Sequence, residues 1–218
     1  MNPFSFYPAF INLNGKDCIV VGGGRIAERK VLTLIKCGAR VKVISPSLTN
    51  RLEKLKKKGK IDHIERTYKK GDLKKAFLVI AATSDEDINR DVSINSPCLV
   101  NVVDMPEMAN FIVPSVVDRN PLIIAISTSG TSPALAKAIR RELETFYNKN
   151  FSKYLVFLRK IRNKVIAEIH DKKERERFLK HIGSAEMINV IRKKGVAKAK
   201  EMVLKRFNLI KHKGEDQC

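Results

Sequence analysis

The stretch DCIVVGGGRIAERKVLTLIKCG, residues 17–38, decides the fold. It opens on a β-branched run that ends in three glycines, and apolar residues then recur at helical spacing up to Gly38. This order predicts a strand, a tight glycine turn and a helix. Gly22, Gly24 and Ala27 form a G-x-G-x-x-A pattern, in which the backbone can approach a pyrophosphate and the helix N-terminus supplies free N–H groups. The stretch therefore predicts a dinucleotide site.

The second predicted strand gives less information about the cofactor. The acidic residue that usually binds the ribose hydroxyls at the end of this strand is absent, and the sequence there reads Ile44, Ser45, Pro46, Ser47. Ser45 or Ser47, together with backbone groups, could hold the adenosine ribose. Because no arginine stands beside them to bind a 2′-phosphate, NAD is favoured over NADP. The alternative is a glycine turn that only packs tightly.

Strands and helices alternate along the first half of the chain. After the opening unit we expect strands over residues 41–44, 61–68, 77–81 and 99–103, and helices over residues 48–58 and 85–94. The run over 77–81 is continuously apolar, as a strand buried on both faces requires. The fold class is therefore α/β, with a Rossmann-like doubly wound parallel sheet.

The pattern changes beyond about residue 109. Two apolar runs, 110–117 and 122–127, flank the turn-rich residues 118–121, which predicts an antiparallel β-hairpin. Helical spacing with basic outer faces then predicts four helices, over residues 133–146, 154–169, 172–182 and 196–207. A β-hairpin region and a C-terminal helical domain are therefore expected to follow the nucleotide-binding domain.

The chain is strongly basic, with a net charge of +20 over 218 residues. Residues 151–218 contribute +11 of this and residues 1–150 contribute +9. Such a field favours a polyanionic partner, which could be nucleic acid, anionic lipid or a polycarboxylate. No apolar run reaches the about 18 residues of a membrane span, and the N-terminus does not read as an export signal, so we expect a cytoplasmic protein with no membrane partner.

The cysteines and histidines give no metal motif. Cys18, Cys37, Cys98 and Cys218 stand singly, with no C-x-x-C pair. The first three are expected to be reduced core residues. The histidines are scattered and are expected to be surface or helix residues. We therefore predict no metal site.

Two loops are expected at the carboxyl ends of strands, where ligands bind in open α/β sheets. Residues 81–85 include Thr83 and end on Asp85, which can cap the next helix. Residues 101–104 run from Asn101 to Asp104. Asp104 is a candidate general base, because a carboxylate near a nicotinamide suits proton removal coupled to hydride transfer. The alternative is a loop aspartate that caps a turn.

Five segments together resemble one family. They are residues 22–30, 81–83, 101–104, 111–115 and 127–133, in that order, and they are similar to precorrin-2 dehydrogenase, the module that also forms the N-terminal part of siroheme synthases. The resemblance covers residues 4 to about 145. Residues 174–178 are a weaker match that extends it to about 182.

The resemblance implies oxidation of precorrin-2, a tetrapyrrole, to sirohydrochlorin with NAD as the hydride acceptor, and in some members Fe²⁺ insertion as well. It assigns Asp104 as the catalytic base. It also implies a homodimer and three domains: an NAD-binding domain over 1–109, a dimerisation region over 110–147 and a basic helical domain over 148–218. The residues expected to bind cofactor are Gly22, Gly23, Gly24, Arg25, Ile26, Ser45, Pro46, Ser47 and Thr83, and those expected to bind substrate are Asn101, Ser127 and Thr128.

Two details qualify the resemblance, and two alternatives stay open. Ser129 stands where the family often has glycine, and Thr128 where it varies between serine and threonine. One alternative is a stand-alone sirohydrochlorin chelatase. The other is an NAD-sensing regulator that binds nucleic acid through the basic helices; because no helix-turn-helix signature is present, no specific nucleic-acid partner is expected.

Overall fold

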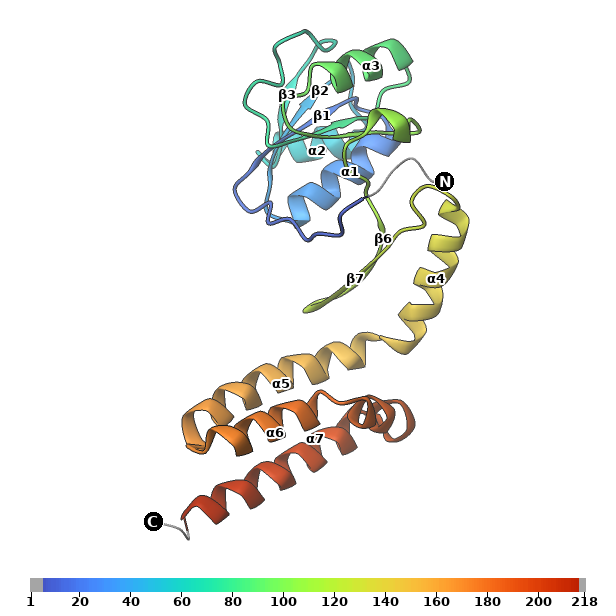
Figure 1. The fold of residues 1–218 in the computed structure, drawn as a ribbon. Helices are drawn as coiled ribbons and strands as arrows, with labels where there is room; N and C mark the ends of the chain where they lie inside the picture. Colours follow the sequence, from blue (N-terminus) through green and yellow to red (C-terminus); the bar gives the residue numbers. More distant parts are fainter. Residues whose placement is uncertain (1–5, 216–218) are drawn as a thin grey trace. The chain divides into compact units, whose positions relative to one another are not determined.

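The computed structural model describes residues 6–215, and the side chains of residues 6–211. The chain divides into two compact units whose boundary in the sequence falls between Val113 and Pro114. The first unit is an α/β sheet structure; the second contains a hairpin and helices (Figure 1). The fold class predicted from the sequence is confirmed. The predicted division at residues 109 and 147 stays a prediction.

A five-stranded parallel sheet in the order β3-β2-β1-β4-β5 forms the centre of the first unit. Its strands are β1 (Asp17–Val21), β2 (Arg40–Ile44), β3 (Asp62–Ile64), β4 (Leu78–Ala81) and β5 (Leu99–Val102). The chain runs outward from β1 to β3 and then returns to the other side of β1 with β4. The strand order therefore reverses between β1 and β4, and ligands bind at such a reversal in open α/β sheets.

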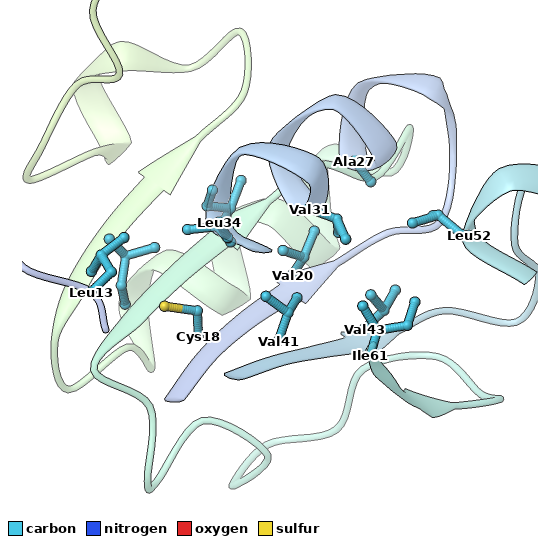
Figure 2. Packing of buried hydrophobic residues seen from close by; sticks show 12 residues of the cluster. Leu13, Cys18, Val20, Ala27, Val31, Leu34, Val41, Val43, Leu52 and Ile61 are labelled. Carbon is cyan, nitrogen blue, oxygen red and sulfur yellow. The ribbon is translucent and has the colours of Figure 1, made fainter. Parts of the chain in front are cut away.

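Helices cover both faces of this sheet because its strands are apolar on both. Helices α1 (Arg25–Lys36) and α2 (Asn50–Lys57) pack on one face, where Val20 of β1 and Val43 of β2 meet Val31 and Leu52 (Figure 2). On the other face, the neighbouring β1 residues Ile19 and Val21 pack with residues of α3 (Glu86–Ile94). Alternate side chains of β1 thus enter two separate cores, as the pleat of a strand requires.

The third predicted strand is much shorter than expected. Only Asp62–Ile64 pairs with β2, and the chain then turns, since the Arg66 backbone N–H donates to the Ile64 carbonyl at 3.0 Å. Arg66 also forms a two-pronged ion pair with Asp72, with both N–O distances 2.8 Å. Residues 65–76 are therefore a loop in which Arg66 and Asp72 are joined by the ion pair.

The second unit begins with an antiparallel hairpin of β6 (Ser115–Arg119) and β7 (Leu122–Ile126), after the short 3-10 helix η1 (Pro106–Met108) of the first unit. The predicted hairpin is confirmed, but its turn is shorter than residues 118–121 because Asp118 and Arg119 pair within the ladder. Four helices follow, α4 (Pro133–Phe146), α5 (Lys149–Glu168), α6 (Lys172–Ile182) and α7 (Ala185–Glu215).

The helical boundaries differ from the predictions in two places. Helix α5 begins five residues earlier than expected because the Asn148 side chain accepts from the N–H groups of Asn150 and Phe151 and caps the helix. Helix α7 begins at Ala185, before the predicted start at 196, and breaks at Gly195, whose φ of 82° is left-handed. A core of α5, α6 and α7 residues, including Phe178 and Val203, holds these helices together.

The cysteines are only partly core residues. Cys18 is buried, Cys98 is half-buried, and Cys37 is exposed because α1 ends at the preceding residue. The expectation that all three are core residues was therefore wrong for Cys37. Cys218 lies outside the described residues. No helix within residues 6–215 is long and apolar enough to cross a membrane.

Candidate functional site

Two glycines of the turn after β1 bring neighbouring loops into close contact. Gly22 has a φ of 117°, and a side chain there would collide with the carbonyl oxygen of Ala82, in the loop after β4. A side chain on Gly23 would collide with the carbonyl oxygen of Ser47, in the loop after β2. These positions require glycine because the loops at the ends of three adjacent strands touch there.

Gly24 differs from its two neighbours. Its φ of −80° is open to any residue, and an added Cβ would meet nothing within 4 Å. It is the N-cap of α1 and forms no side-chain cap, so the first N–H groups of the helix face open space with the positive end of the helix dipole. The space that a side chain would fill is where a pyrophosphate fits.

A cavity of about 750 Å³ opens at this point, over the carboxyl ends of the strands. Every residue predicted to bind cofactor lines it, and so does Asp104. Ala82, Ser84 and Asp85, from the expected loop over 81–85, also line it, whereas the sequence did not indicate Leu48, Thr49, Thr67 and Tyr68, from the loops after β2 and β3, or Ile88 of α3. Their common signal is that each follows a strand of the parallel sheet, which is where such a cavity forms.

The turn after β2 is held by hydrogen bonds of its own. Ser45 is buried, and its Oγ donates to the Ser47 carbonyl at 2.7 Å, so this hydroxyl shapes the turn. Ser47 is exposed at the cavity. Thr49 caps α2 by accepting from the Leu52 N–H and donates to Glu28 of α1 at 2.5 Å. Glu28 thus ties α1 to the start of α2, next to the turn after β2.

The loop after β4 is ordered by a buried amide. Asn89 of α3 is 4% exposed, and its Oδ1 lies 2.9 Å from Thr83 Oγ1 and 3.2 Å from the Thr83 backbone N. Asp85 caps α3 by accepting from the N–H groups of Asp87 and Ile88, as predicted. Thr83 therefore has a fixed position in the cavity wall.

Asp104 ends the segment that follows β5. It is exposed to the cavity and has a φ of 61°, a backbone conformation that few residues other than glycine adopt. Aspartate tolerates this region better than most, but non-glycine residues held there cluster at functional sites. The preceding residue, Val103, packs against the core beneath α1, which fixes the carboxylate at the cavity edge.

Lys30 of α1 lies near enough to Asp104 to interact with it electrostatically. Burial lowers the pKa of Lys30, the neighbouring Arg29 lowers it further, and the negative charge of Asp104 opposes both effects. Lys30 stands one turn after Ile26, which lines the cavity. The carboxylate therefore faces a half-buried cation that the sequence reasoning did not identify.

None of the three residues predicted to bind substrate is among the residues that line the cavity. Asn101 is 8% exposed, and its amide donates to the Phe111 carbonyl at 3.1 Å, so it ties two backbone segments together. Ser127 and Thr128 belong to the second unit, where their hydroxyls accept from the N–H groups of Ser129 and Ser132. Their assignment to substrate stays a prediction.

Tyr68 has an unusual environment. Its hydroxyl is buried and forms no hydrogen bond with any residue that the structure describes, and the residue lines the cavity. Burial raises the pKa of Tyr68, and Asp91 and Asp72 raise it further.

Within residues 6–211, no group of three His, Cys, Asp or Glu side chains is placed to hold a metal ion.

Comparison with known proteins places these features in a family. Residues 9–115 match a family model for NAD(P)-binding domains, and residues 119–145 match the model of the central domain of sirohaem biosynthesis proteins. The chain is 44% identical over 176 residues to the siroheme synthase of Thioalkalivibrio sulfidiphilus, which covers 79% of the chain and 36% of that protein.

A second siroheme synthase, from Methylobacillus flagellatus, is 44% identical over 161 residues, covering 72% of the chain and 34% of that protein. The chain thus spans about a third of the length of these relatives. Among solved structures, SirC, a precorrin-2 dehydrogenase, matches with a TM-score of 0.78 and 26% identity, over 92% of this chain and all of that one. The chain belongs to the family of precorrin-2 dehydrogenases and siroheme synthase N-terminal modules.

Proposed function

We propose that the chain is an NAD-dependent precorrin-2 dehydrogenase that oxidises precorrin-2 to sirohydrochlorin in siroheme biosynthesis. One observation carries the proposal. The glycine turn, the turn after β2 and Asp104 line the same cavity at the strand-order reversal. The match to SirC, a precorrin-2 dehydrogenase that the chain covers in full, supports it.

The residues present fit NAD. The open space at Gly24 and the free N-terminus of α1 would bind the pyrophosphate, and the loop that carries Ser47 and Thr49 would lie at the adenosine ribose. Arg51, which could otherwise attract a 2′-phosphate, lies 3.8 Å from the Glu28 carboxylate. When bound, NAD⁺ supplies the acceptor for a hydride.

The reaction removes one hydride and one proton from precorrin-2. Asp104 is the base that takes the proton, since it is the carboxylate at the end of β5 in the cavity. Lys30 of α1 places a positive charge near that carboxylate. The net charge of +20 favours association with a polycarboxylate such as precorrin-2.

A homodimer is the second part of the proposal. The second unit exposes apolar residues on its hairpin and first helix: Val116 is 37% exposed, Ile123 50% and Leu135 52%. An exposed apolar patch marks an interaction site. The resemblance to dimeric family members points to a second copy of this chain. We place the enzyme in the cytoplasm, as the sequence predicts.

An anaerobic kinetic assay tests the catalytic role of Asp104. Asp104→Asn keeps the size of the side chain and removes the base, so kcat should fall by about 10²–10⁴ while the Kd for NAD⁺ changes less than threefold. The exposed Asp87→Asn on α3 is a control that removes the same charge elsewhere. A normal kcat in Asp104→Asn would remove the assigned role.

A further inference from the structure

His63 connects the edge strand β3 to the turn that lines the cavity. The half-buried ring lies between two partners: Nε2 is 2.9 Å from the carbonyl oxygen of Ser45, and Nδ1 is 3.0 Å from Nζ of Lys56 on α2. Lys56 is also 3.5 Å from a carboxylate oxygen of Glu65. The imidazole therefore bridges helix α2 and the end of β2.

The two partners fix which ring nitrogen carries the proton. The Lys56 ammonium has only donors, so Nδ1 must accept from it. The neutral imidazole then carries its proton on Nε2, which donates to the Ser45 carbonyl. One side chain thus accepts from Lys56 and donates to the cavity turn, and an apolar ring of the same shape could do neither.

Ser45 lies in a part of the cavity wall that several hydrogen bonds hold in place. The Ser45 N–H donates to the Ile64 carbonyl of β3 at 3.1 Å, and the Ser45 hydroxyl donates to the Ser47 carbonyl. That same Ser47 carbonyl leaves no room for a side chain on Gly23. Small displacements of the turn therefore close or open the space beside the glycine turn.

We infer that His63 is a positioning residue for the adenosine half of the cofactor, through the hydrogen bond from its Nε2 to the Ser45 carbonyl. The inference rests on the proposed NAD site. His63 does not line the cavity itself and acts only by fixing the turn of Ser45, Pro46 and Ser47, which does. The surface role that the sequence suggested for this histidine is replaced by a structural link to the site.

Two substitutions separate the hydrogen bonds from the shape of the ring. His63→Phe keeps a ring but leaves the buried Ser45 carbonyl without its donor, so the Kd for NAD⁺ should rise about tenfold. His63→Gln carries an amide N–H that can donate to Ser45 and an oxygen that can accept from Lys56. Its Kd should stay within about threefold of the wild-type value. Calorimetric titration measures both.

Fragments of the cofactor locate the effect. ADP-ribose, which contains the adenosine half, should lose affinity for His63→Phe by the same factor as NAD⁺. Nicotinamide mononucleotide, which lacks adenosine, should bind wild type and variant equally in a displacement titration. At saturating NAD⁺, kcat should be unchanged, so that only the KM for NAD⁺ rises. A purely structural defect would instead lower kcat and the affinity for every ligand together.

The controls make each outcome decisive. His170→Phe changes an exposed histidine of the second unit and should leave all constants unchanged. If His63→Phe does not fold, Lys56→Met tests the same link, because it leaves the ring but removes its partner, and should raise the Kd for NAD⁺ about threefold. Unchanged NAD⁺ affinity in folded His63→Phe, or in Lys56→Met where His63→Phe does not fold, would overturn the inference. Failure of the wild-type protein to bind NAD⁺ would instead overturn the proposed function.

Discussion

The three glycines after β1 have different physical roles, although the sequence presents them as one run. Gly22 needs glycine for its backbone conformation and for the contact with the loop after β4, whereas Gly24 needs it for neither. The absence of a side chain at Gly24 leaves space that the fold does not use. That difference can be tested without the substrate.

Gly24→Val should weaken NAD⁺ binding and leave the fold intact. The new side chain would occupy the pyrophosphate space, and since nothing lies within 4 Å of the Cβ position, the melting temperature of the free protein should not change. We expect the Kd for NAD⁺ to rise at least about tenfold. Gly22→Ala is the matched contrast, because it should lower the melting temperature. Tight NAD⁺ binding by Gly24→Val would show that the pyrophosphate lies elsewhere.

Ser129 has a strained backbone conformation in the loop before α4. Its φ of 50° is left-handed, which costs about 1–2 kcal/mol for a residue with a Cβ. Ser129→Gly should therefore be more stable than Ser129→Ala by about 1 kcal/mol in urea unfolding, since the greater flexibility of unfolded glycine offsets part of the relief. An alanine variant as stable as the glycine variant would contradict this explanation.

The sequence indicated the residues of the first βαβ unit that line the cavity, because the spacing of glycines marks where the backbone turns tightly. It could not predict the contribution of Glu28, Lys30 or His63. Glu28 and Lys30 lie on α1 and His63 lies on β3, and their interactions with the segments around the cavity arise only through packing between elements. The left-handed backbone of Asp104 was likewise invisible, because aspartate is common in ordinary loops.

At the level of elements, the predicted strand over residues 61–68 was wrong in its second half, which belongs to the loop over 65–76. A strand was expected to extend to residue 68, but the Arg66–Asp72 ion pair and the hydrogen bond from the Lys69 N–H to Asp72 hold these residues in a loop. This loop carries Thr67 and Tyr68 into the cavity. Such pairings are side-chain events that local propensity does not report.

The Arg66–Asp72 pair should make the stability of the protein depend on pH. The hydrogen bonds from Arg66 hold the pKa of Asp72 below its ordinary value of 3.8, and the bond from Lys69 adds to this. A lowered folded pKa stabilises the fold at pH values above 3.8, and that stabilisation is lost as the pH falls through the folded pKa.

Asp72→Asn should therefore lower the free energy of unfolding by about 1–3 kcal/mol at pH 7. The difference from wild type should shrink below pH 3.8, where the wild-type carboxyl also becomes protonated. Urea titrations across this range measure it, with the exposed Asp62→Asn as a control of equal charge change. A difference that stays constant with pH would show that the ion pair is not its source.

The helices were predicted more reliably than the strand ends. Helices α4 and α6 have the predicted bounds because proline and aspartate mark their starts and their apolar spacing is regular. The first part of α7 was missed because the helical pattern is interrupted by Gly195, whose left-handed conformation breaks the helix there. The spacing of apolar residues along the sequence indicates where a helix lies, but it does not show where one helix ends and the next begins.

For the whole molecule, the dimer should depend on the hairpin. Ile123→Lys puts a charge on an apolar side chain that is already half exposed, so the monomer should fold, but a dimer formed through this face should dissociate. Sedimentation should show half the wild-type mass. Ile94→Lys, on a 76% exposed isoleucine of α3, should leave the dimer intact. A dimeric Ile123→Lys protein would place the interface elsewhere.

Of the polyanionic partners that the basic charge of the chain allows, the proposed site favours a small polycarboxylate. The first unit holds the cavity, and a polycarboxylate substrate would be drawn to the field of the entire chain, with an association rate that falls as salt screens it. The larger share of charge lies in residues 151–218, on helices whose outer faces are exposed.

The coupling of substrate oxidation to cofactor reduction is the central claim, and its stoichiometry tests it most directly. Wild-type protein is mixed anaerobically with precorrin-2 and NAD⁺, and NADH and sirohydrochlorin are followed together by absorbance. We predict one NADH for each sirohydrochlorin formed, with no product when NAD⁺ is omitted. Sirohydrochlorin formed at the same rate without NADH, or NAD⁺ bound with precorrin-2 left unchanged, would contradict the claim.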